Sequence, residues 1–274
     1  MSDEWTRPLT VDEMYGDWDV EWDDAMALTD VSLEPRSSMS ILDNVGALDP
    51  DEHAVVLDIG GRDGKFALPM AERFGCRVII VDPIEGNLDF ARSDSAEQAA
   101  GHLIDLAQGT INDIPLGDDT VDIVFSRDML GHVGDLEGAL AECRRVLKPS
   151  GAMVIHEVFG TDLLEPLERA RMVADLAMVD ERLDIDLFES NVTTAGFTIS
   201  DVEVIGSEWM EALLEREDGE RRLLQAARMR RNQDQIVEKV GVIPYRVMRS
   251  NTTYTIYRLI GKLEERIYTL HRSR

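Results

Sequence analysis

Residues 54–64, AVVLDIGGRDG, join an apolar run to a turn that is rich in glycine. Directly after this stretch, Phe66, Met70 and Phe74 recur at helical spacing, and Gly75 stands where a helix would end. The pattern predicts a strand, a tight turn and a helix. Glycines in such a turn allow positive φ angles and let a ligand approach the main chain closely. The turn is therefore a candidate binding loop, with a purely structural turn as the alternative.

A second apolar run, residues 78–81, ends in an acid, Asp82, which lies 18 residues beyond Gly64. A carboxylate at this place can accept hydrogen bonds from ribose hydroxyls. A dinucleotide site would require the fingerprint G-x-G-x-x-G, and Arg62 and Asp63 interrupt that spacing. The two runs therefore predict a nucleoside site without the dinucleotide fingerprint.

The turn at residues 58–64 resembles motif I, D-x-G-x-G-x-G, of the class I S-adenosylmethionine (SAM) dependent methyltransferases. Three later segments are similar to further motifs of this family and stand in the same order: 109–116, 121–133 and 145–151. Arg62 replaces the middle glycine of motif I, and Thr110 replaces an acid that contacts adenine in the family. The resemblance covers about residues 40–160 and points to small-molecule methyltransferases of the ubiquinone and menaquinone type.

Strands that alternate with helices predict an α/β fold with a doubly wound parallel sheet, and ligands bind at the carboxyl ends of its strands. The fold implied is Rossmann-like, with seven strands. The fifth strand is expected at 152–155 after a helix over 136–147, the sixth at 197–205 and the seventh at 266–270. We divide the chain into an N-terminal helical cap, a SAM-binding core, a helical cap insertion between strands six and seven, and a closing strand: 1–50, 51–206, 207–260 and 261–274.

The resemblance implies SAM as the cofactor and places its contacts at the first turn and at the following strand ends. The expected cofactor-binding residues are Asp58, Gly60, Gly61, Arg62, Gly64, Asp82, Pro83, Ile111, Asn112, Ser126 and Arg127. Asp82 is expected to grip both ribose hydroxyls, so its loss would weaken binding and leave the melting curve nearly unchanged. Arg62 and Arg127 are candidates for holding the methionine carboxylate or a substrate anion.

Methyl transfer from a sulfonium requires alignment, a dry site and sometimes a base. Candidates for the base are His132, after the fourth strand, and Glu157, at the end of the fifth. His156 and Glu157 face opposite sides of their strand, so at most one of them points to the pocket. Tyr15 is a candidate for lining the pocket, because in the family an N-terminal helical segment of this kind often closes over the cofactor. An ordinary packed side chain is the alternative for each.

Substrate specificity is expected in the cap insertion. Trp209 is a candidate for an apolar wall, and Arg228 and Arg231 lie three residues apart, where they share a helix face and can hold one anion. A solvated basic face is the alternative reading of these arginines.

Charge is distributed unevenly along the 274 residues. The net charge is −26, yet residues 220–274 carry 13 bases and five acids, while residues 1–50 carry 13 acids and two bases. These opposite charges can attract the two ends of the chain to each other, or hold two subunits together in a homodimer or with a partner. The basic end can also bind an anion. The acidic balance, together with Ser-Arg-Asp-Met at 126–129 in place of N-P-P-Y, argues against nucleic acid as a substrate.

The sequence thus predicts a methyltransferase that acts on a small molecule in secondary or cofactor metabolism, with an anionic substrate as a narrower option. The alternative is a chain that binds SAM or its product and works as a subunit or catalyst of another reaction. No apolar stretch approaches the roughly 20 residues that span a bilayer, and the start lacks a signal-peptide core. We therefore expect a cytoplasmic protein that does not enter membranes, has two reduced cysteines and has no metal site.

Overall fold

The computed structural model describes residues 7–15, 26–29, 31–216 and 220–273. The chain divides into two units, Met1–Glu34 and Pro35–Arg274. In the first unit, the hydroxyl of Thr10 caps helix α1 (Val11–Met14) by accepting from the Glu13 N–H, and the Glu13 carboxylate accepts from the Thr10 N–H in return. Tyr15 follows this helix and is exposed.

The second unit is built on a seven-stranded sheet whose strand order is β3-β2-β1-β4-β5-β7-β6. The strands are β1 (Val55–Ile59), β2 (Arg77–Asp82), β3 (Ile104–Gln108), β4 (Val121–Arg127), β5 (Leu147–Gly160), β6 (Phe197–Val204) and β7 (Leu263–Arg272). The first five strands are parallel to one another, and β7 is antiparallel to both β5 and β6. The strand order reverses direction at β1, so a ligand crevice is expected beyond the ends of β1 and β4.

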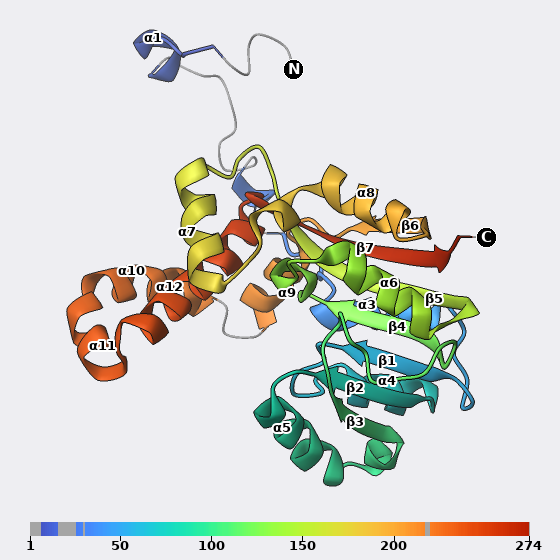
Figure 1. Ribbon diagram of the computed structural model, residues 1–274. Helices are drawn as coiled ribbons and strands as arrows, with labels where there is room; N and C mark the ends of the chain where they lie inside the picture. The colour runs from blue at the N-terminus through green and yellow to red at the C-terminus, as the bar shows by residue number, and fades with distance from the viewer. Residues whose placement is uncertain (1–6, 16–25, 30, 217–219, 274) are drawn as a thin grey trace. The chain divides into compact units, whose positions relative to one another are not determined.

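Helices cover both faces of the sheet (Figure 1). The helices and short 3-10 turns before β6 are η2 (Ser38–Ser40), α3 (Ile41–Gly46), α4 (Ala67–Phe74), α5 (Glu85–Ala96), η3 (Ala99–Leu103), η4 (Leu130–His132), α6 (Leu136–Val146), α7 (Pro166–Leu176), η5 (Asp180–Leu183) and α8 (Ile185–Thr194). One buried cluster joins α6 and α8 to the sheet, and another joins α3, α4 and α5 to the opposite face. The predicted Rossmann-like fold class is confirmed.

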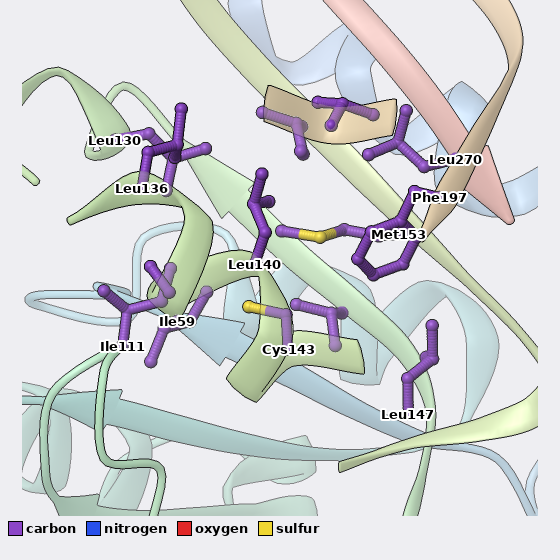
Figure 2. Close-up of a cluster of buried hydrophobic side chains, with 14 of the residues drawn as sticks. Ile59, Ile111, Leu130, Leu136, Leu140, Cys143, Leu147, Met153, Phe197 and Leu270 are labelled. Atoms are coloured by element: carbon purple, nitrogen blue, oxygen red, sulfur yellow. The ribbon is translucent and has the colours of Figure 1, made fainter. Parts of the chain in front are cut away.

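Side chains of the central strands alternate between these two clusters. In β4, Val124 packs with α6, whereas Ile123 and Phe125 pack on the other face. Figure 2 shows Leu140 and Cys143 of α6 against Met153 of β5. Each large apolar side chain buried in this way contributes about 1.5–3 kcal/mol, which fixes the strand ends that carry the polar residues described below.

Several predicted boundaries shift, including that of β7, which covers Leu263–Arg272 rather than 266–270. Helix α6 ends at Val146 rather than 147, because Leu147 already pairs with Val121 of β4. Strand β5 extends well beyond the predicted 152–155. Strand β7 pairs with one edge of it over the whole of Ala152–Gly160, and β4 pairs with the other edge at Leu147 and over Ala152–His156. By contrast, α4 ends as predicted at Gly75, whose φ of 69° is in the left-handed region.

The connection between β6 and β7 is helical, as predicted, and consists of α9 (Glu208–Arg216), α10 (Glu220–Arg231), α11 (Gln233–Val240) and α12 (Val242–Leu259). Gly241, with a φ of 86°, separates α11 from α12. The Asp218-Gly219 pair, a typical turn sequence between α9 and α10, lies outside the described residues. Across the described ranges, no helix is long and apolar enough to cross a membrane.

Helix α12 is fastened to α7 by a cluster of polar contacts. The carboxylate of Asp175 on α7 is nearly buried and pairs with Arg246 at 2.6 Å and with Arg249 at 2.5 Å. The Ser250 hydroxyl donates to the same carboxylate at 2.8 Å. Two cations and a hydroxyl therefore compensate one acid, and α12 is held alongside α7 at the carboxyl-end edge of the sheet (Figure 1).

Candidate cofactor and acceptor site

A cleft of about 910 Å³ opens at the carboxyl ends of β1, β2 and β4. Its lining includes most of the residues that the sequence assigned to cofactor binding: Asp58, Gly60, Gly61, Arg62, Asp82, Pro83, Ile111, Asn112 and Arg127. These residues come from four separate loops, and the switch in strand order brings them to one edge of the sheet.

The turn after β1 requires glycine at positions 60 and 61. Gly60 has a φ of 72°, and its N–H donates to the carbonyl of Val81 at 2.8 Å. A Cβ atom on Gly61 would lie 2.6 Å from the carboxyl group of Asp58, which is buried beneath the turn. Arg62, which replaces a glycine of the family motif, also has a positive φ, of 51°. The main-chain path of the motif is therefore retained, and the arginine side chain is an addition to it.

Asp82 ties the turn to the start of α5. Its Oδ2 accepts from the backbone N–H of Arg62 at 3.1 Å. Its Oδ1 accepts from the Ile84 N–H at 2.9 Å and from the Asn87 side-chain amide at 3.1 Å. A carboxylate has about four acceptor positions, so three internal bonds leave capacity for a ligand. Asp82 thus supports the loop and also faces the cleft.

Asp58 is a buried acid with one unpaired carboxyl oxygen among the described residues. It is 3% exposed, and its Oδ2 makes no hydrogen bond within the described residues. Burial raises the pKa of Asp58 to about 7, the negative charge of Asp82 adds to this rise, and Arg127 opposes it. A cation or hydrogen-bond donor that enters the cleft would satisfy this carboxyl group.

Arg127 closes the floor of the cleft next to the phenyl ring of Phe66. Its guanidinium carbon lies 4.7 Å from the ring centroid, and its Nε has no hydrogen-bond partner in the described part of the chain. Burial lowers the pKa of Arg127 from its usual value. A partly buried guanidinium with such an unpaired Nε suits a carboxylate or another anion.

Two expected cofactor residues do not line the cleft. Ser126 is fully buried in β4, so it lies behind the surface that a ligand would touch. Gly64 has a φ of 78°, and a Cβ there would meet the Cδ1 of Ile80 at 3.2 Å. Its role in the structure is to let α4 and α5 pack closely on the sheet.

The loop after β4 carries a residue that the sequence did not single out. Asp128 has a φ of 51°, which is uncommon for a non-glycine residue. Its Oδ1 accepts from the hydroxyl of Tyr254 on α12 at 2.9 Å. Because these two residues are 126 positions apart in the chain, no local pattern connects them. The signal that was available is the polar Arg127-Asp128 pair at the end of an apolar strand.

His132 and Glu157 have different places. His132 lines the cleft, is exposed, and has its Nδ1 3.1 Å from the carbonyl of Ala177. Glu157 is buried beneath the loop, where its Oε1 accepts from the N–H groups of Met129 at 3.1 Å and Leu130 at 2.7 Å. Burial raises the pKa of Glu157 to about 8, and the charge of Asp128 adds to the rise. Its geometry is that of a residue that positions the loop.

The residues expected to contact substrate lie elsewhere. Trp209 is 1% exposed, its ring centroid is 4.9 Å from that of His156, and its indole N–H donates to Ser40 at 3.0 Å. Helix α9 lies with its apolar side on the sheet, so this tryptophan is part of the core and not of a ligand wall. Arg228 and Arg231 are exposed on α10 and line neither the cleft nor the cavity next to it. Tyr15 belongs to the first unit, and its approach to the cofactor stays a prediction.

Comparisons with known proteins agree with this geometry. Residues 57–155 match the family model described as a methyltransferase domain. The chain is 31% identical over 140 residues to the sarcosine/dimethylglycine N-methyltransferase of Halorhodospira halochloris, covering 51% of this chain and 49% of that one. It is 30% identical over 109 residues to a ubiquinone biosynthesis O-methyltransferase of Mesorhizobium japonicum, covering 40% and 43%. The chain thus spans about half the length of the curated relatives it matches.

The crystal structure of a putative sarcosine dimethylglycine methyltransferase from Galdieria sulphuraria superposes with a TM-score of 0.65 at 17% identity, covering 92% of this chain and 88% of that one. The sheet order and the crevice at its switch point are those of a Rossmann-like fold. Residues 57–155 match a methyltransferase domain, and the fold and this match are consistent with the class I SAM-dependent methyltransferases. The predicted family resemblance and the class of cofactor, SAM, are confirmed.

The residues present fit SAM on structural grounds. The buried Asp58 has an oxygen without a partner, Arg127 has a guanidinium nitrogen without one, and Gly61 leaves a cradle that a Cβ would fill. Asp82 retains acceptor capacity at the end of β2, where a ribose would lie. The cleft therefore offers carboxyl groups and a guanidinium, which match a ligand that carries a cation, an anion and a sugar.

Proposed function

We propose that the chain is a SAM-dependent methyltransferase that acts on a small molecule. The observation that carries the proposal is the pair of buried acids, Asp58 and Asp82, on either side of a glycine turn in a cleft of about 910 Å³. The match of residues 57–155 to methyltransferase domains supports it, as do relatives that carry methyltransferase names.

In this proposal SAM supplies the methyl group and, as a sulfonium, its own leaving group. Asp82 holds the ribose hydroxyls, Asp58 holds the positively charged end of the methionine moiety, and Arg127 with Arg62 holds its carboxylate. Each of these side chains lines the cleft. Their joint effect is to fix the orientation of the reacting groups, which is the main contribution that a protein makes to such a displacement.

His132 is the candidate that accepts the proton lost by the acceptor, because it lines the cleft and remains exposed. Glu157 acts through the loop, since its carboxyl group is committed to backbone N–H groups of residues 129 and 130. The anion-binding role that the sequence suggested for Arg228 and Arg231 is not part of the proposal, because neither residue lines the cleft or the cavity next to it. A cytoplasmic location, a role in biosynthesis and a homodimeric or partner-bound state stay predictions from the sequence.

The direct test is transfer of label. The protein is incubated with methyl-labelled SAM and a fractionated small-molecule extract, and mass spectrometry identifies any acceptor whose mass has risen by one methylene unit. Labelled product that depends on the protein supports the proposal. Tight SAM binding without transfer to any fraction would instead support the alternative, a SAM-binding chain that works as a subunit or catalyst of another reaction.

SAM binding is expected to depend on pH through Asp58. Its pKa is raised to about 7 without ligand, and a bound cation favours the ionised form, so binding releases a proton. Affinity should therefore rise by up to about tenfold from pH 6 to pH 8. Calorimetry in two buffers of different ionisation enthalpy measures both affinity and proton release. Asp58→Asn is the matched control, and an equal slope in this variant would contradict the assignment.

Arg62 offers a test of how the methionine end is held. Its positive φ suits glycine, so Arg62→Gly should retain the turn while removing only the side chain. If the guanidinium binds the methionine carboxylate, the variant binds SAM about tenfold more weakly and binds adenosine nearly as well as the parent. Equal losses for both ligands, measured by calorimetry, would reduce Arg62 to a loop residue.

A further inference from the structure

A second cavity, of about 330 Å³, adjoins the cofactor cleft. The two share three lining residues, Asp128, His132 and Asn251, so they lie side by side. The glycine turn and Asp82 do not reach this second space. It therefore begins where the cofactor-binding groups end.

The second cavity has a polar end and an apolar end. The polar end is the shared one, and Tyr254 joins it through the hydrogen bond from its hydroxyl to Asp128. The apolar end is formed by Leu176 at the end of α7, Met178 just after it and Val247 on α12. Ala177 lies at the shared end, since its carbonyl is 3.1 Å from Nδ1 of His132. A ligand that matches this lining has a polar head directed toward the cofactor cleft and an apolar remainder directed away from it.

The apolar end continues along α12. Val247, Asn251 and Tyr254 line the cavity at i, i+4 and i+7, so they share one face of the helix. One turn earlier on the same face is Ile243, which is 72% exposed. Val247 and Ile243 are therefore the apolar residues that this face of α12 offers from the cavity toward the N-terminal end of the helix.

Asp128 is the acid at the polar end, and the charges of Arg127 and Arg258 act on it at a distance. Asp175 also lines the cavity, but Arg246 and Arg249 neutralise it. Asp128 has no salt bridge within the described residues, and the hydrogen bond from Tyr254 is the one that those residues give to its carboxylate. Asp128 is therefore available to accept a hydrogen bond from an amine or a hydroxyl.

We infer that this cavity is the acceptor subsite and that the acceptor is amphiphilic. Its hydrogen-bond-donating head, an amine or a hydroxyl, lies against Asp128 beside the cofactor cleft, and its apolar tail lies along Val247 toward Ile243. The inference rests on the proposed function and adds to it the class of substrate. It places the nucleophile at the boundary of the two cavities, within the reach of His132.

Binding to the complex with S-adenosylhomocysteine tests this inference without turnover. The probes are n-butylamine and n-octylamine, with 1-butanol and 1-octanol as the hydroxyl counterparts, and dissociation constants come from calorimetry. Lengthening butyl to octyl should tighten binding by about tenfold or more, because the added methylene groups leave water. Preference for the amine or the alcohol identifies the head, and a lack of any chain-length effect with both heads would overturn the inference.

Two pairs of variants locate the ligand. Val247→Gln should reduce the octyl-to-butyl ratio to about threefold or less, whereas Met248→Gln, at an exposed neighbour that lines neither cavity, should leave the ratio unchanged. Asp128→Asn, which tolerates the positive φ, should weaken the amines about tenfold and the alcohols by less than about twofold. Equal ratios in the Val247 and Met248 variants would place the tail elsewhere.

The same titrations separate this inference from the function on which it rests. If S-adenosylhomocysteine binds the parent and each variant normally while the tail has no effect, the acceptor subsite is refuted and the methyltransferase proposal stands. If S-adenosylhomocysteine does not bind the parent chain, the proposed function itself fails. Melting curves of the variants verify that each one is folded.

Discussion

Asp82→Ala is expected to weaken SAM binding by about tenfold or more. The variant removes the charge-assisted hydrogen bonding of this carboxylate to the ribose, and one such bond is worth about 1.5–3 kcal/mol. It also removes the acceptor of three internal hydrogen bonds, from Arg62, Ile84 and Asn87, that shape the turn. The melting temperature should therefore fall as well, which replaces the expectation from sequence that stability would be nearly unchanged.

Calorimetry with SAM and with S-adenosylhomocysteine measures the first effect, and thermal melting measures the second. Asp89→Ala is a suitable control, because Asp89 is an exposed acid on α5 that lies outside the cleft and pairs with Arg92 at the surface. The control should bind normally and melt within a degree or two of the parent. Unchanged affinity in the folded Asp82 variant would refute the assignment of the cleft to SAM.

Glu265→Ala is expected to lower the free energy of unfolding by about 3–5 kcal/mol. Glu265 is fully buried on β7, where its Oε2 lies 2.8 Å from Nε2 of His156 and also contacts the guanidinium of Arg258. Burial by itself would raise the pKa of Glu265, but the hydrogen bond with His156 and the charge of Arg258 hold it at about 2. Truncation leaves the buried Arg258 without its counter-charge, and that uncompensated charge is the source of the cost.

Glu264→Ala is the matched control for this variant. Glu264 is the preceding residue of the same strand and pairs with Arg266, but that pair is partly exposed. Its loss should cost about 1 kcal/mol or less. Urea denaturation at neutral pH measures both variants, and similar losses in the two would contradict a special role for the buried acid.

The same comparison has a defined dependence on pH. The folded-state pKa of Glu265, about 2, lies below its ordinary value of 4.5, so the contribution of its charge to stability is full above about pH 4.5. As the pH falls from 4.5 toward 2, this contribution is lost. The difference in stability between parent and Glu265→Ala should shrink over that window, and a difference that stays constant down to pH 3 would argue against an ionised Glu265.

Much of the cofactor side could be predicted from sequence, because its chemistry is local. The turn at 58–64 joins one strand to the next helix, and its glycines indicate directly where the backbone takes positive φ angles. Asp82 follows the neighbouring strand at a spacing that the crossover helix sets. In both cases the residues that act together are close in the sequence or are related by a repeating unit.

The acceptor side could not be predicted in the same way, because its contacts join distant segments. Tyr254 donates to Asp128 across 126 positions, and Arg249 pairs with Asp175 across 74. Trp209 indicates an apolar face on α9, but the sequence does not say whether that face meets a ligand or the sheet. For the same reason Arg228 and Arg231 were candidates for anion binding until their exposure on α10 was known.

The antiparallel pairing of β6 with β7 makes the long connection between them a hairpin loop. The two strands are neighbours in register from Phe197 opposite Arg272 to Val204 opposite Arg266, so everything from α9 to α12 is, topologically, the loop of a hairpin. The entropy of closing such a loop grows only with the logarithm of its length. Helices α10 and α11 add no described residue to the buried clusters, so they can be lengthened, shortened or exchanged at little cost to the sheet. This part of the connection can therefore change while the glycine turn at 58–64, far away in the chain, stays as it is.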